Sequence, residues 1–485
     1  MKRVLLGAVA ALAFAGMAQA AELSAQDRAQ IKASVDKAGP RLGEVAKQIW
    51  GFAEVGYQEH KSSALLQAEL KKAGFKVEAG VAGMPTAFVG SFKTGDGPVL
   101  AILAEYDALP GLAQAASPER KVVPGVAGHA CGHHVFGAAS VQAAISLKEW
   151  MVANGVKGEV RVYGSPAEEG GSGKVYLVRA GLFKDVDATI HWHPGDSNNA
   201  SQGVSLANIS GKFRFTGASS HASGAPWRGR SALDGVEVLD NAVNMMREHV
   251  PDGTRIHYVI TDGGQAPNVV PEKAEVYYYV RHADPQVVRD VMERVKKAAD
   301  GAALATETKV AFEQTGGVYN MLPNETLAKV MDANLRDVGG VVWDGQERAF
   351  AEAMQKQLPT TNAKLESAAE VQPMKIGGAG GGSTDVADVS WVTPTVGMSA
   401  ATWVPGTPGH SWQAVAAGGT SMATKGGVVA AKSMALTGAA LLRDPATIAQ
   451  AKSELDQKRG PNFQYKAMVG DRPPPLDYRK KAGAE

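Results

Sequence analysis

The residues best suited to chemistry are three histidines and the only cysteine, which stand together in the segment GHACGHH (128–134). Thiolate sulfur and imidazole nitrogen are common ligands of zinc and related metals. Cys131 and His133 can reach one ion if the segment is an extended loop that enters a helix. The alternative is a buried cysteine beside surface histidines. The segment therefore indicates a candidate metal site.

A pair of carboxylates, Glu168 and Glu169, follows Pro166 at the end of a predicted strand. Adjacent carboxylates repel each other unless a cation or a shared proton lies between them. In a metal hydrolase, one such group binds the ion and the other takes the proton of the attacking water. A solvated acidic turn is the alternative interpretation.

Four other histidines are candidates with weaker signals. His191 and His193 lie on one side of their strand if it continues, so that one is a ligand and the other lies behind it. His410 follows a turn rich in proline and glycine, where a lone histidine is usually a surface residue. His221, in GASSHA (217–222), is ambiguous by itself.

These residues must be positioned by strands and helices that alternate along the chain. Short apolar runs at 98–104, 160–163 and 188–192 predict buried strands, and each is followed by polar residues. Helices are predicted at the ranges 24–50, with Ser24 and Asp27 as a capping box, 61–73 and 135–150. This α/β pattern predicts a mostly parallel mixed sheet flanked by helices, with chemistry at the carboxyl ends of its strands.

From residue 206 the order becomes strand-helix-strand-strand-helix-strand, which is typical of a ferredoxin-like α+β unit. We expect this unit to be inserted into the first as a lid or dimerisation domain. A glycine-rich loop at 377–382, a helix at 418–442 over the sheet, and a polar, proline-rich tail along the surface complete the prediction. The predicted divisions are residues 1–20, 21–205, 206–316, 317–460 and 461–485.

Composition excludes several classes of protein. The chain has 485 residues, which exceeds one ordinary domain, and 50 Lys and Arg against 49 Asp and Glu argue against a nucleic-acid partner. A single cysteine excludes a disulfide scaffold. The HExxH and GxSxG motifs are absent, and the Gly377–Asp385 stretch lacks the lysine of a phosphate-binding loop.

The N-terminus has the form of a signal peptide. Lys2 and Arg3 precede an apolar run from Val4 to Met17, and Ala18-Gln19-Ala20 resembles a cleavage site. The run is shorter than the roughly 20 residues of a membrane span, although an uncleaved anchor is the alternative. We expect cleavage near Ala20, export to a periplasm, and no membrane association afterwards. In that oxidising compartment a lone Cys131 is buried, reactive or a metal ligand.

Taken together, the ordered segments resemble the metallopeptidase superfamily of aminoacylases and glutamate carboxypeptidases. Within it the chain is similar to the branch of indole-acetyl-amino-acid hydrolases and aminobenzoyl-glutamate hydrolases, and the resemblance covers nearly all of the chain after residue 20. The matching blocks are AEYDALPG (104–111), GHACGHH (128–134), SPAEEGGSGK (165–174), IHWHPG (190–195), GASSHA (217–222), APNVVPEKAEVYYYVR (266–281), GGGSTDVADVSW (380–391) and PGHSWQ (408–413).

The resemblance implies a centre of two divalent metal ions, zinc or manganese with cobalt as a further option. The implied ligands are Cys131, His133, Glu169, His193 and His410. It also implies Glu168 as general base and Asp107 as a residue behind the ligands. The histidine matching His221 reaches the partner subunit's site and steadies the oxyanion, while Asn268 and Arg281 match positions that hold the substrate's carboxylate.

Three positions depart from the family's usual pattern. His134 replaces the usual aspartate after CGH, GSTD (382–385) replaces GSED, and Glu105 stands at the histidine of the common HxD ligand motif. The Cys131 thiolate is expected to supply the missing coordination.

The expected function is hydrolysis of the amide bond in N-acyl or N-aroyl amino acids, small molecules such as aminobenzoyl-glutamate. We expect a homodimer through the inserted domain, or a heteromer with a second, related chain. A periplasmic dipeptidase or aminopeptidase remains an alternative, as does a weakly active or non-catalytic partner chain. Five converging ligands argue against the last, because without metal they stay unsatisfied.

Overall fold

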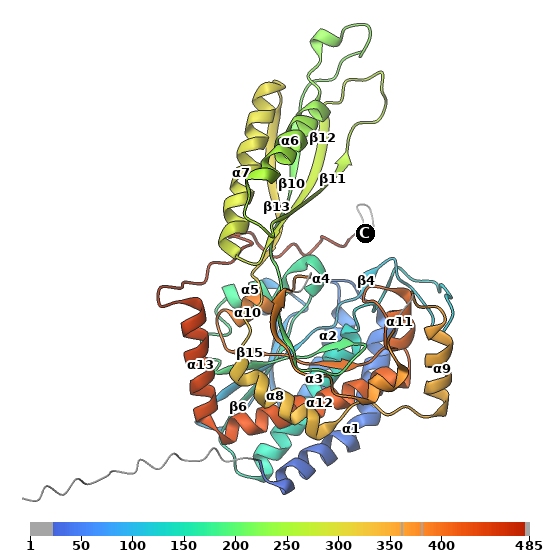
Figure 1. The fold of residues 1–485 in the computed structure, drawn as a ribbon, viewed down its shortest axis with the longest axis vertical. Coiled ribbons are helices and arrows are strands. Elements are labelled where there is room, and N and C mark those ends of the chain that lie inside the picture. Colours follow the sequence, from blue (N-terminus) through green and yellow to red (C-terminus); the bar gives the residue numbers. More distant parts are fainter. Residues whose placement is uncertain (1–22, 360–361, 380–381, 481–485) are drawn as a thin grey trace, which may run out of the picture.

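A computed structural model of the chain describes residues 23–359, 362–379 and 382–480. It has an α/β body and a narrower α+β unit, the lid, which projects from the body (Figure 1). The predicted signal peptide lies outside the described residues. Among the described helices, none combines the length and the apolar character that crossing a bilayer requires.

The body is built on a six-stranded mixed sheet in the order β1-β2-β6-β3-β7-β15. Strands β6, β3, β7 and β15 run parallel, whereas β1 and β2 are antiparallel to their neighbours. The bounds of the six strands are β1 Lys76–Ala79, β2 Phe88–Gly95, β3 Val99–Ala104, β6 Gly158–Gly164, β7 Ala188–Ile190 and β15 Thr395–Val396. The expected mixed sheet is therefore confirmed.

Each face of this sheet packs into a different core because side chains alternate along a strand. On β3, Leu100 and Ile102 join the core beneath the long helices, whereas Ala101 and Leu103 join the core shared with the lid. The long helices contact one another, and α3 also contacts β3 and β6. They are α1 Ala25–Phe52, α3 His133–Ala153 and α12 Ser421–Arg443.

The remaining body elements are shorter. The helices are α2 His60–Lys72, α4 Glu168–Gly171, α5 Gly173–Arg179, α8 Glu325–Val338, α9 Gly345–Gln355, α10 Val386–Ser390, α11 Trp412–Gly418 and α13 Pro445–Arg459, with 3-10 turns at Val81–Gly83 and Leu365–Ala369. The strands are β4 Leu109–Pro110, β5 Ala127–Gly128, β8 His193–Gly195, β9 Gln202–Val204, β14 Ile376–Ala379 and β16 Ser399–Ala401.

The lid has the predicted strand-helix-strand-strand-helix-strand order. Its antiparallel sheet has the order β11-β12-β10-β13, and α6 and α7 pack on it (Figure 1). The elements are β10 Ala207–Thr216, α6 Ala232–Met246, β11 Arg255–Asp262, β12 Lys273–His282, α7 Pro285–Ala305 and β13 Lys309–Val318, with 3-10 turns at Pro226–Arg228 and Arg247–His249. This strand order is that of a ferredoxin-like unit.

Several local predictions were correct and others were wrong. Ser24 and Asp27 form the expected capping box at the start of α1. The strand predicted for 188–192 ends at Ile190, and a separate strand begins at His193. The helix predicted for 418–442 begins at Ser421, because Gly418 ends α11 and Gly419 packs closely against Trp50. The predicted 377–382 loop starts within β14.

The tail, residues 461–480, does not simply follow the outer surface. It passes between the body and the base of the lid (Figure 1). The Gln58 amide donates to the Leu476 carbonyl at 2.9 Å, and the Gln314 amide on the lid donates to the Met468 carbonyl. The tail therefore contacts both units.

Candidate active site

The candidate residues lie where the parallel strands of the body end. Asp107 follows β3, and Cys131 precedes α3, whose first residue is His133. Glu168 and Glu169 follow β6, and His193 begins β8. His410 occupies the turn before α11. The carboxyl ends of parallel strands meet at one edge of a sheet, which brings these distant segments together.

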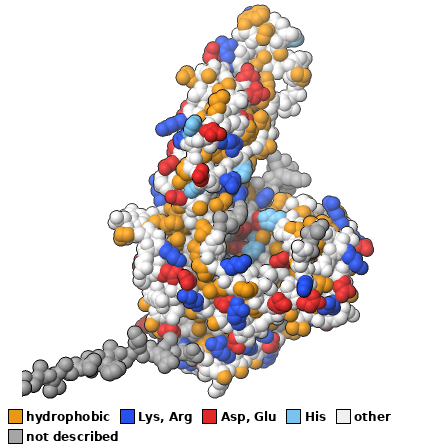
Figure 2. Space-filling model, in the orientation of Figure 1, with side chains coloured by type: hydrophobic (Ala, Val, Ile, Leu, Met, Phe, Trp, Pro, Cys, Tyr) orange, Lys and Arg blue, Asp and Glu red, His pale blue; other side chains and the backbone are white. Residues whose placement is uncertain are grey.

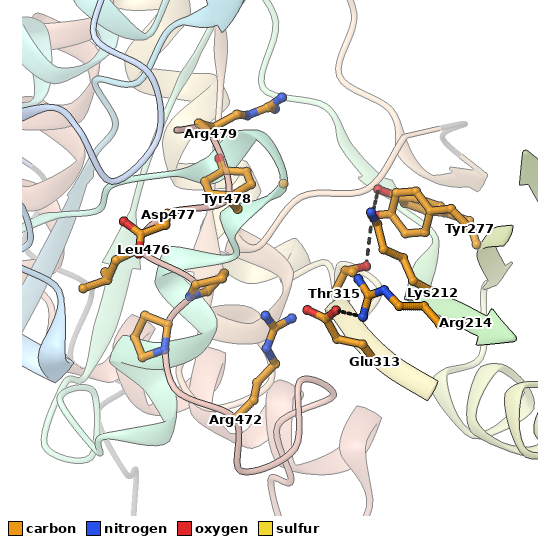
Figure 3. Close-up of a pocket in the computed structure, with 14 residues that line it drawn as sticks. Lys212, Arg214, Tyr277, Glu313, Thr315, Arg472, Leu476, Asp477, Tyr478 and Arg479 are labelled. Carbon is orange, nitrogen blue, oxygen red and sulfur yellow. Dashed lines mark hydrogen bonds and ion pairs between the residues drawn. The ribbon is translucent and has the colours of Figure 1, made fainter. Parts of the chain in front are cut away.

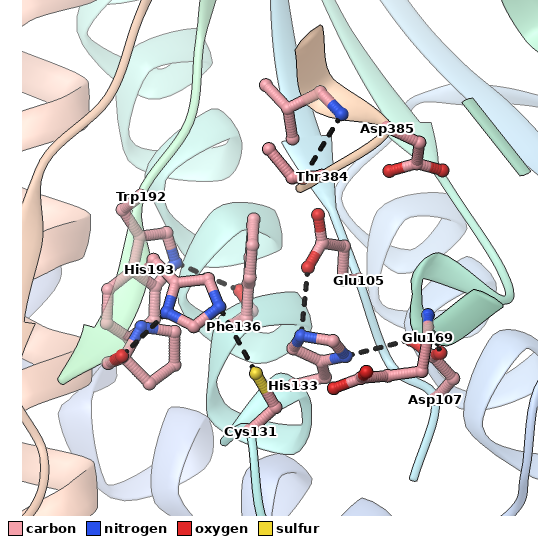
Figure 4. A network of polar contacts seen from close by, with 12 residues as sticks. Glu105, Asp107, Cys131, His133, Phe136, Glu169, Trp192, His193, Thr384 and Asp385 are labelled. Carbon is pink, nitrogen blue, oxygen red and sulfur yellow. Dashed lines mark hydrogen bonds and ion pairs between the residues drawn. The ribbon is translucent and has the colours of Figure 1, made fainter. Parts of the chain in front are cut away.

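Cys131 is the common member of two groups of potential metal ligands. One group is Cys131, His133 and His193, and the other is Cys131, Glu169 and His410; within each, one ligand atom from every residue lies within 4.8 Å of the others. Cys131 Sγ is 3.4 Å from His193 Nε2, and His410 Nε2 is 3.0 Å from Glu169 Oε1. Figure 4 shows Cys131, His133, His193 and Glu169 directed toward one space.

The orientation of His133 is fixed from both sides of its ring. Its Nδ1 is 2.8 Å from Asp107 Oδ1, and its Nε2 is 3.1 Å from Glu105 Oε2 (Figure 4). The other Asp107 oxygen accepts a hydrogen bond of 2.9 Å from the Glu169 backbone N–H. Asp107 thus lies behind the potential ligands and connects two of the segments that carry them.

Burial and close charges alter the acid–base properties of the cluster. Burial raises the pKa of the Cys131 thiol, but His193 and His133 outweigh it and hold that pKa well below its ordinary value. Burial, Glu105 and Glu169 together raise the pKa of Glu168 well above the usual range. Proximity to Cys131 and Glu169 raises the pKa of His410 to about 10. The pocket therefore favours a thiolate and a basic carboxylate.

This donor set fits a metal centre. Thiolate, imidazole and carboxylate are the ligands that zinc, cobalt and manganese share. Three buried atoms of the cluster make no hydrogen bond of regular geometry within the part of the chain that the structure describes, although each is in an ion-pair contact of 3.0 or 3.1 Å: Glu105 Oε2 with His133 Nε2, and Glu169 Oε1 with His410. Buried polar atoms held only in this way are incompletely satisfied, and cations coordinated among them would complete their bonding.

A buried ion cluster beside the potential ligands was not predicted from the sequence. Lys174 Nζ is 2.6 Å from Glu105 Oε1 and 2.8 Å from Asp385 Oδ1, and these three side chains are at most 2% exposed. Glu105, at the family's usual histidine position, therefore shares its charge with Lys174 and His133. The sequence signal was limited to the position of Glu105, Lys174 and Asp385 in three of the matching blocks.

The other histidines near the cluster have structural roles. His129 Nε2 lies 3.0 Å from the Ile49 carbonyl, and His134 Nε2 lies 2.8 Å from the Gly418 carbonyl. Burial lowers the pKa of His134 to about 4, so it is neutral at its position in place of the usual aspartate. His191 belongs to none of the ligand groups found among the described residues. It lies between the end of β7 at Ile190 and the start of β8 at His193, so the alternation expected for one continuous strand does not apply.

The three candidate residues of the lid are separated by the structure. Arg281, near the base of the lid on β12, lines a cavity of about 370 Å³ together with Glu168, Glu169 and His410. His221 and Asn268 are exposed, lie beside each other near the far end of the lid, and do not line this cavity. In the space-filling view, histidine and acidic side chains are visible in a recess beneath the lid (Figure 2).

Residues with strained backbone flank the carboxylate pair. Ala167 and Ser172 have φ values of 57° and 60°, and His410 has 57°, in the left-handed region that residues other than glycine rarely adopt. Two residues of the tail support this loop: the Tyr478 hydroxyl and the Arg479 guanidinium both donate to the Glu169 carbonyl, at 2.9 and 2.8 Å.

Comparison with known proteins places this site in a family. Residues 207–307 match the M20 peptidase dimerisation domain. The chain is 39% identical to the B component of p-aminobenzoyl-glutamate hydrolase from Escherichia coli strain K12, over 86% of this chain and 92% of that protein. It is 32% identical to the Xaa-Arg dipeptidase of Mus musculus, over 67% and 74%.

Solved structures agree in fold. The YXEP protein of Bacillus subtilis, described as a dinuclear metal binding peptidase from the M20 family, superposes with a TM-score of 0.56 and 18% identity. The match covers 84% of this chain and 99% of that one. The convergent donors, the dimerisation domain and the sequence identity together show that the chain belongs to the M20 peptidase family and is a metal-dependent amide hydrolase.

Proposed function

We propose that the protein is a dinuclear amidohydrolase that cleaves N-acyl or N-aroyl amino acids, with aminobenzoyl-glutamate as the first substrate to test. The observation that carries the proposal is the pair of three-residue ligand groups that share Cys131. Two adjacent groups with one common thiolate suit two neighbouring ions, and the hydrolase similar to this chain over most of its length supports the substrate class.

In this proposal the five ligands are Cys131, His133, Glu169, His193 and His410. Bound divalent ions would polarise the substrate carbonyl and acidify water. Their identity, whether zinc, manganese or cobalt, is open to this mixed donor set.

Glu168 acts as the general base. It lies in the same cavity as Glu169 and His410 but outside both groups that contain Cys131. Its raised pKa suits a carboxylate that accepts a proton from water and returns it to the leaving amine. Glu168 also groups with Glu105 and His133 as a potential ligand, so metal retention is a necessary part of its test.

We further propose that His221 and Asn268 act in the partner subunit's site of a homodimer. Both are exposed at the lid's far end, away from the ligands of their own chain. Strand β11 is at the edge of the lid sheet and pairs only with β12 among the described strands; its Val259 and Ile260 are 55% and 40% exposed, and such an edge can pair with a second chain. Arg281 would bind the substrate's carboxylate within its own chain.

A related second chain is the other candidate for the partner. The protein is also 25% identical to the A component of p-aminobenzoyl-glutamate hydrolase from the same Escherichia coli strain, over 63% of this chain and 81% of that protein. Size-exclusion chromatography of the purified protein, followed by assays with and without a related chain, distinguishes a self-sufficient homodimer from a heteromer. The dipeptidase alternative is tested with an Xaa-Arg dipeptide in the same assays.

We also propose that residues 1–20 are removed and that the mature protein is periplasmic, on the basis of the charged, apolar and small-residue order of that segment. N-terminal sequencing of the protein from a periplasmic fraction tests this. A chain that retains Met1 in the cytoplasm would contradict it.

The central experiment compares the wild-type protein with Glu168→Gln. We expect two metal ions per wild-type chain, and hydrolysis of aminobenzoyl-glutamate that a chelator abolishes. Glu168→Gln should keep both ions and lose about 10²–10⁴-fold in kcat, the usual contribution of a general base. Loss of one ion in the variant would make Glu168 a ligand instead, and an unchanged kcat would remove its proposed role.

A further inference from the structure

We infer that Arg479 of the C-terminal tail binds a carboxylate of the substrate and thereby selects N-acyl derivatives of dicarboxylic amino acids. This inference rests on the proposed function and adds a specificity residue from outside the body and the lid. It is carried by the position of Arg479 in the cavity beside Glu168, and by the absence of an anionic partner for it among the described residues.

The tail reaches this cavity along a path fixed by hydrogen bonds. Arg179 donates to the carbonyls of Gly470 and Arg472 at 2.7 and 2.8 Å. Farther along, the Tyr478 ring packs edge-on against Tyr57, with 5.7 Å between the ring centroids. These contacts anchor the residues immediately before Arg479 and hold its backbone next to the loop of the carboxylate pair.

The Arg479 side chain is only partly satisfied by these surroundings. One terminal nitrogen donates to the Glu169 carbonyl, and the guanidinium lies 4.9 Å from the centre of the Tyr478 ring. Its Nε is buried and has no hydrogen-bond partner in the described part of the chain. No described carboxylate lies within the 4.0 Å of an ion pair, so a guanidinium with five donors keeps most of them available.

Arg281 presents the same situation in the same cavity. Its Nε is also buried without a hydrogen bond among the described residues, and its guanidinium lies 5.4 Å from the centre of the Tyr279 ring. Arg281 comes from the lid and Arg479 from the tail, and both line the cavity of about 370 Å³ that also contains Glu168 and Glu169. Two partly buried cations without anionic partners in the described structure indicate an anionic ligand.

Two guanidiniums from different elements match a substrate with two separate carboxylates. An amide-linked dicarboxylic amino acid has one carboxylate next to the scissile nitrogen and a second on its side chain. We assign the first to Arg281 and the second to Arg479. Arg479 also lines a neighbouring pocket of about 720 Å³, bordered by Tyr277, Tyr478 and Arg472 (Figure 3). Arg479 therefore stands at the boundary between the two spaces.

The test compares Arg479→Gln and Arg479→Lys with the matched control Arg472→Gln, which removes a tail guanidinium that donates to the Gln314 carbonyl in the neighbouring pocket. The substrates are p-aminobenzoyl-glutamate and its isostere p-aminobenzoyl-glutamine, in which a neutral amide replaces the side-chain carboxylate and the α-carboxylate is kept. We expect Arg479→Gln to lower kcat/KM for the glutamate derivative about 10- to 100-fold more than for the glutamine derivative, the usual value of one charge-assisted contact. Loss of the hydrogen bond to the Glu169 carbonyl lowers the activity on both substrates by a common factor and leaves their ratio unaffected. Arg479→Lys should restore part of the difference, and Arg472→Gln should leave the ratio of the two substrates unchanged.

A merely structural role for Arg479 would lower activity on both substrates equally, and that result would overturn the inference. Calorimetric titration of metal-loaded protein with N-acetyl-glutamate and N-acetyl-glutamine separates this failure from that of the proposed function. If the wild-type protein hydrolyses neither substrate, the proposed function fails. The inference is still supported in that case if the wild-type protein binds N-acetyl-glutamate more tightly than N-acetyl-glutamine and Arg479→Gln loses this difference. Equal binding of both compounds by the wild-type protein contradicts it.

Discussion

Replacing Lys174 by methionine should destabilise the body strongly, because Lys174 neutralises two buried carboxylates. Its Nζ contacts Glu105 and Asp385, and its backbone N–H also donates to Asp385 at 2.8 Å. Burial lowers the pKa of Lys174, but the two carboxylates outweigh it and raise that pKa above the ordinary value. Methionine fills a similar volume and removes the charge.

The expected loss follows from the charges that remain. Removing one partner of a buried ion pair costs about 3–5 kcal/mol, and here a single ammonium serves two carboxylates. We therefore expect a loss of about 3–5 kcal/mol in the free energy of unfolding at pH 7.5. Burial raises the pKa of Asp385 to about 6 even with Lys174 present, so this residue takes up a proton as the pH falls and relieves part of the repulsion. The loss should be smaller at pH 5.5.

Equilibrium unfolding in urea, followed by tryptophan fluorescence with a chelator present, measures this effect without a contribution from bound metal. Lys174→Met with Asp385→Asn should recover part of the loss, since one carboxylate is then removed. Lys93→Met is the control, because the Lys93–Asp96 pair is on the surface and its removal should leave the midpoint unchanged. A loss below about 1 kcal/mol, or the same loss at both pH values, would refute this account of the buried cluster.

Two further predictions concern pH and subunit composition. Burial raises the pKa of Asp388 to about 7. Between about pH 4 and pH 7 the folded chain therefore keeps a proton that the unfolded chain has released. The free energy of unfolding should fall as the pH rises through this range and then level off. Asp388→Asn should flatten this slope in unfolding measured from pH 5 to 8, and identical slopes would contradict the prediction. If His221 acts in the partner's site, subunits carrying His221→Ala and subunits carrying Glu168→Gln should complement each other when mixed 1:1. Half of the randomly mixed dimers then contain one subunit of each kind, and one of the two sites in such a dimer is complete, so the mixture should regain about one quarter of wild-type activity. An inactive mixture, despite mixed dimers shown by native mass spectrometry, would place His221 outside catalysis.

The sequence was sufficient where local chemistry decides the outcome. The caps and periodicity predicted α1 and the ferredoxin-like lid, because a capping box and alternating apolar residues depend on near neighbours. The short spacing of Cys131 and His133 likewise indicated a shared site. Alternation along a strand could not decide which of His191 and His193 lies with the other potential ligands, because β7 ends at Ile190 and the backbone turns before β8 begins at His193.

Contacts between distant segments could not be predicted in the same way. Glu105, Lys174 and Asp385 are separated by dozens to hundreds of residues. They meet because Glu105 directly follows β3, Lys174 lies in the first turn of α5, and Asp385 directly precedes α10. Arg479 is in a tail whose polar and proline-rich composition is typical of a solvated segment. Its route into the cavity is determined by acceptors and rings on other elements, such as Tyr57 and the Glu169 carbonyl.

The hydrogen bonds from the tail to the Glu169 carbonyl also affect the order in which the site forms during synthesis. Tyr478 and Arg479 follow every other candidate site residue along the chain, so a ribosome completes the sheet, the lid and the ligand-bearing segments before it releases them. Until they dock, the strained turn between Ala167 and Ser172 lacks two of its supports, and residues in such backbone conformations relax unless their surroundings hold them. The loop that carries Glu168 and Glu169 is therefore completed only after Tyr478 and Arg479 have been synthesised, and a chain cut before Tyr478 would lack both of these hydrogen bonds to the Glu169 carbonyl.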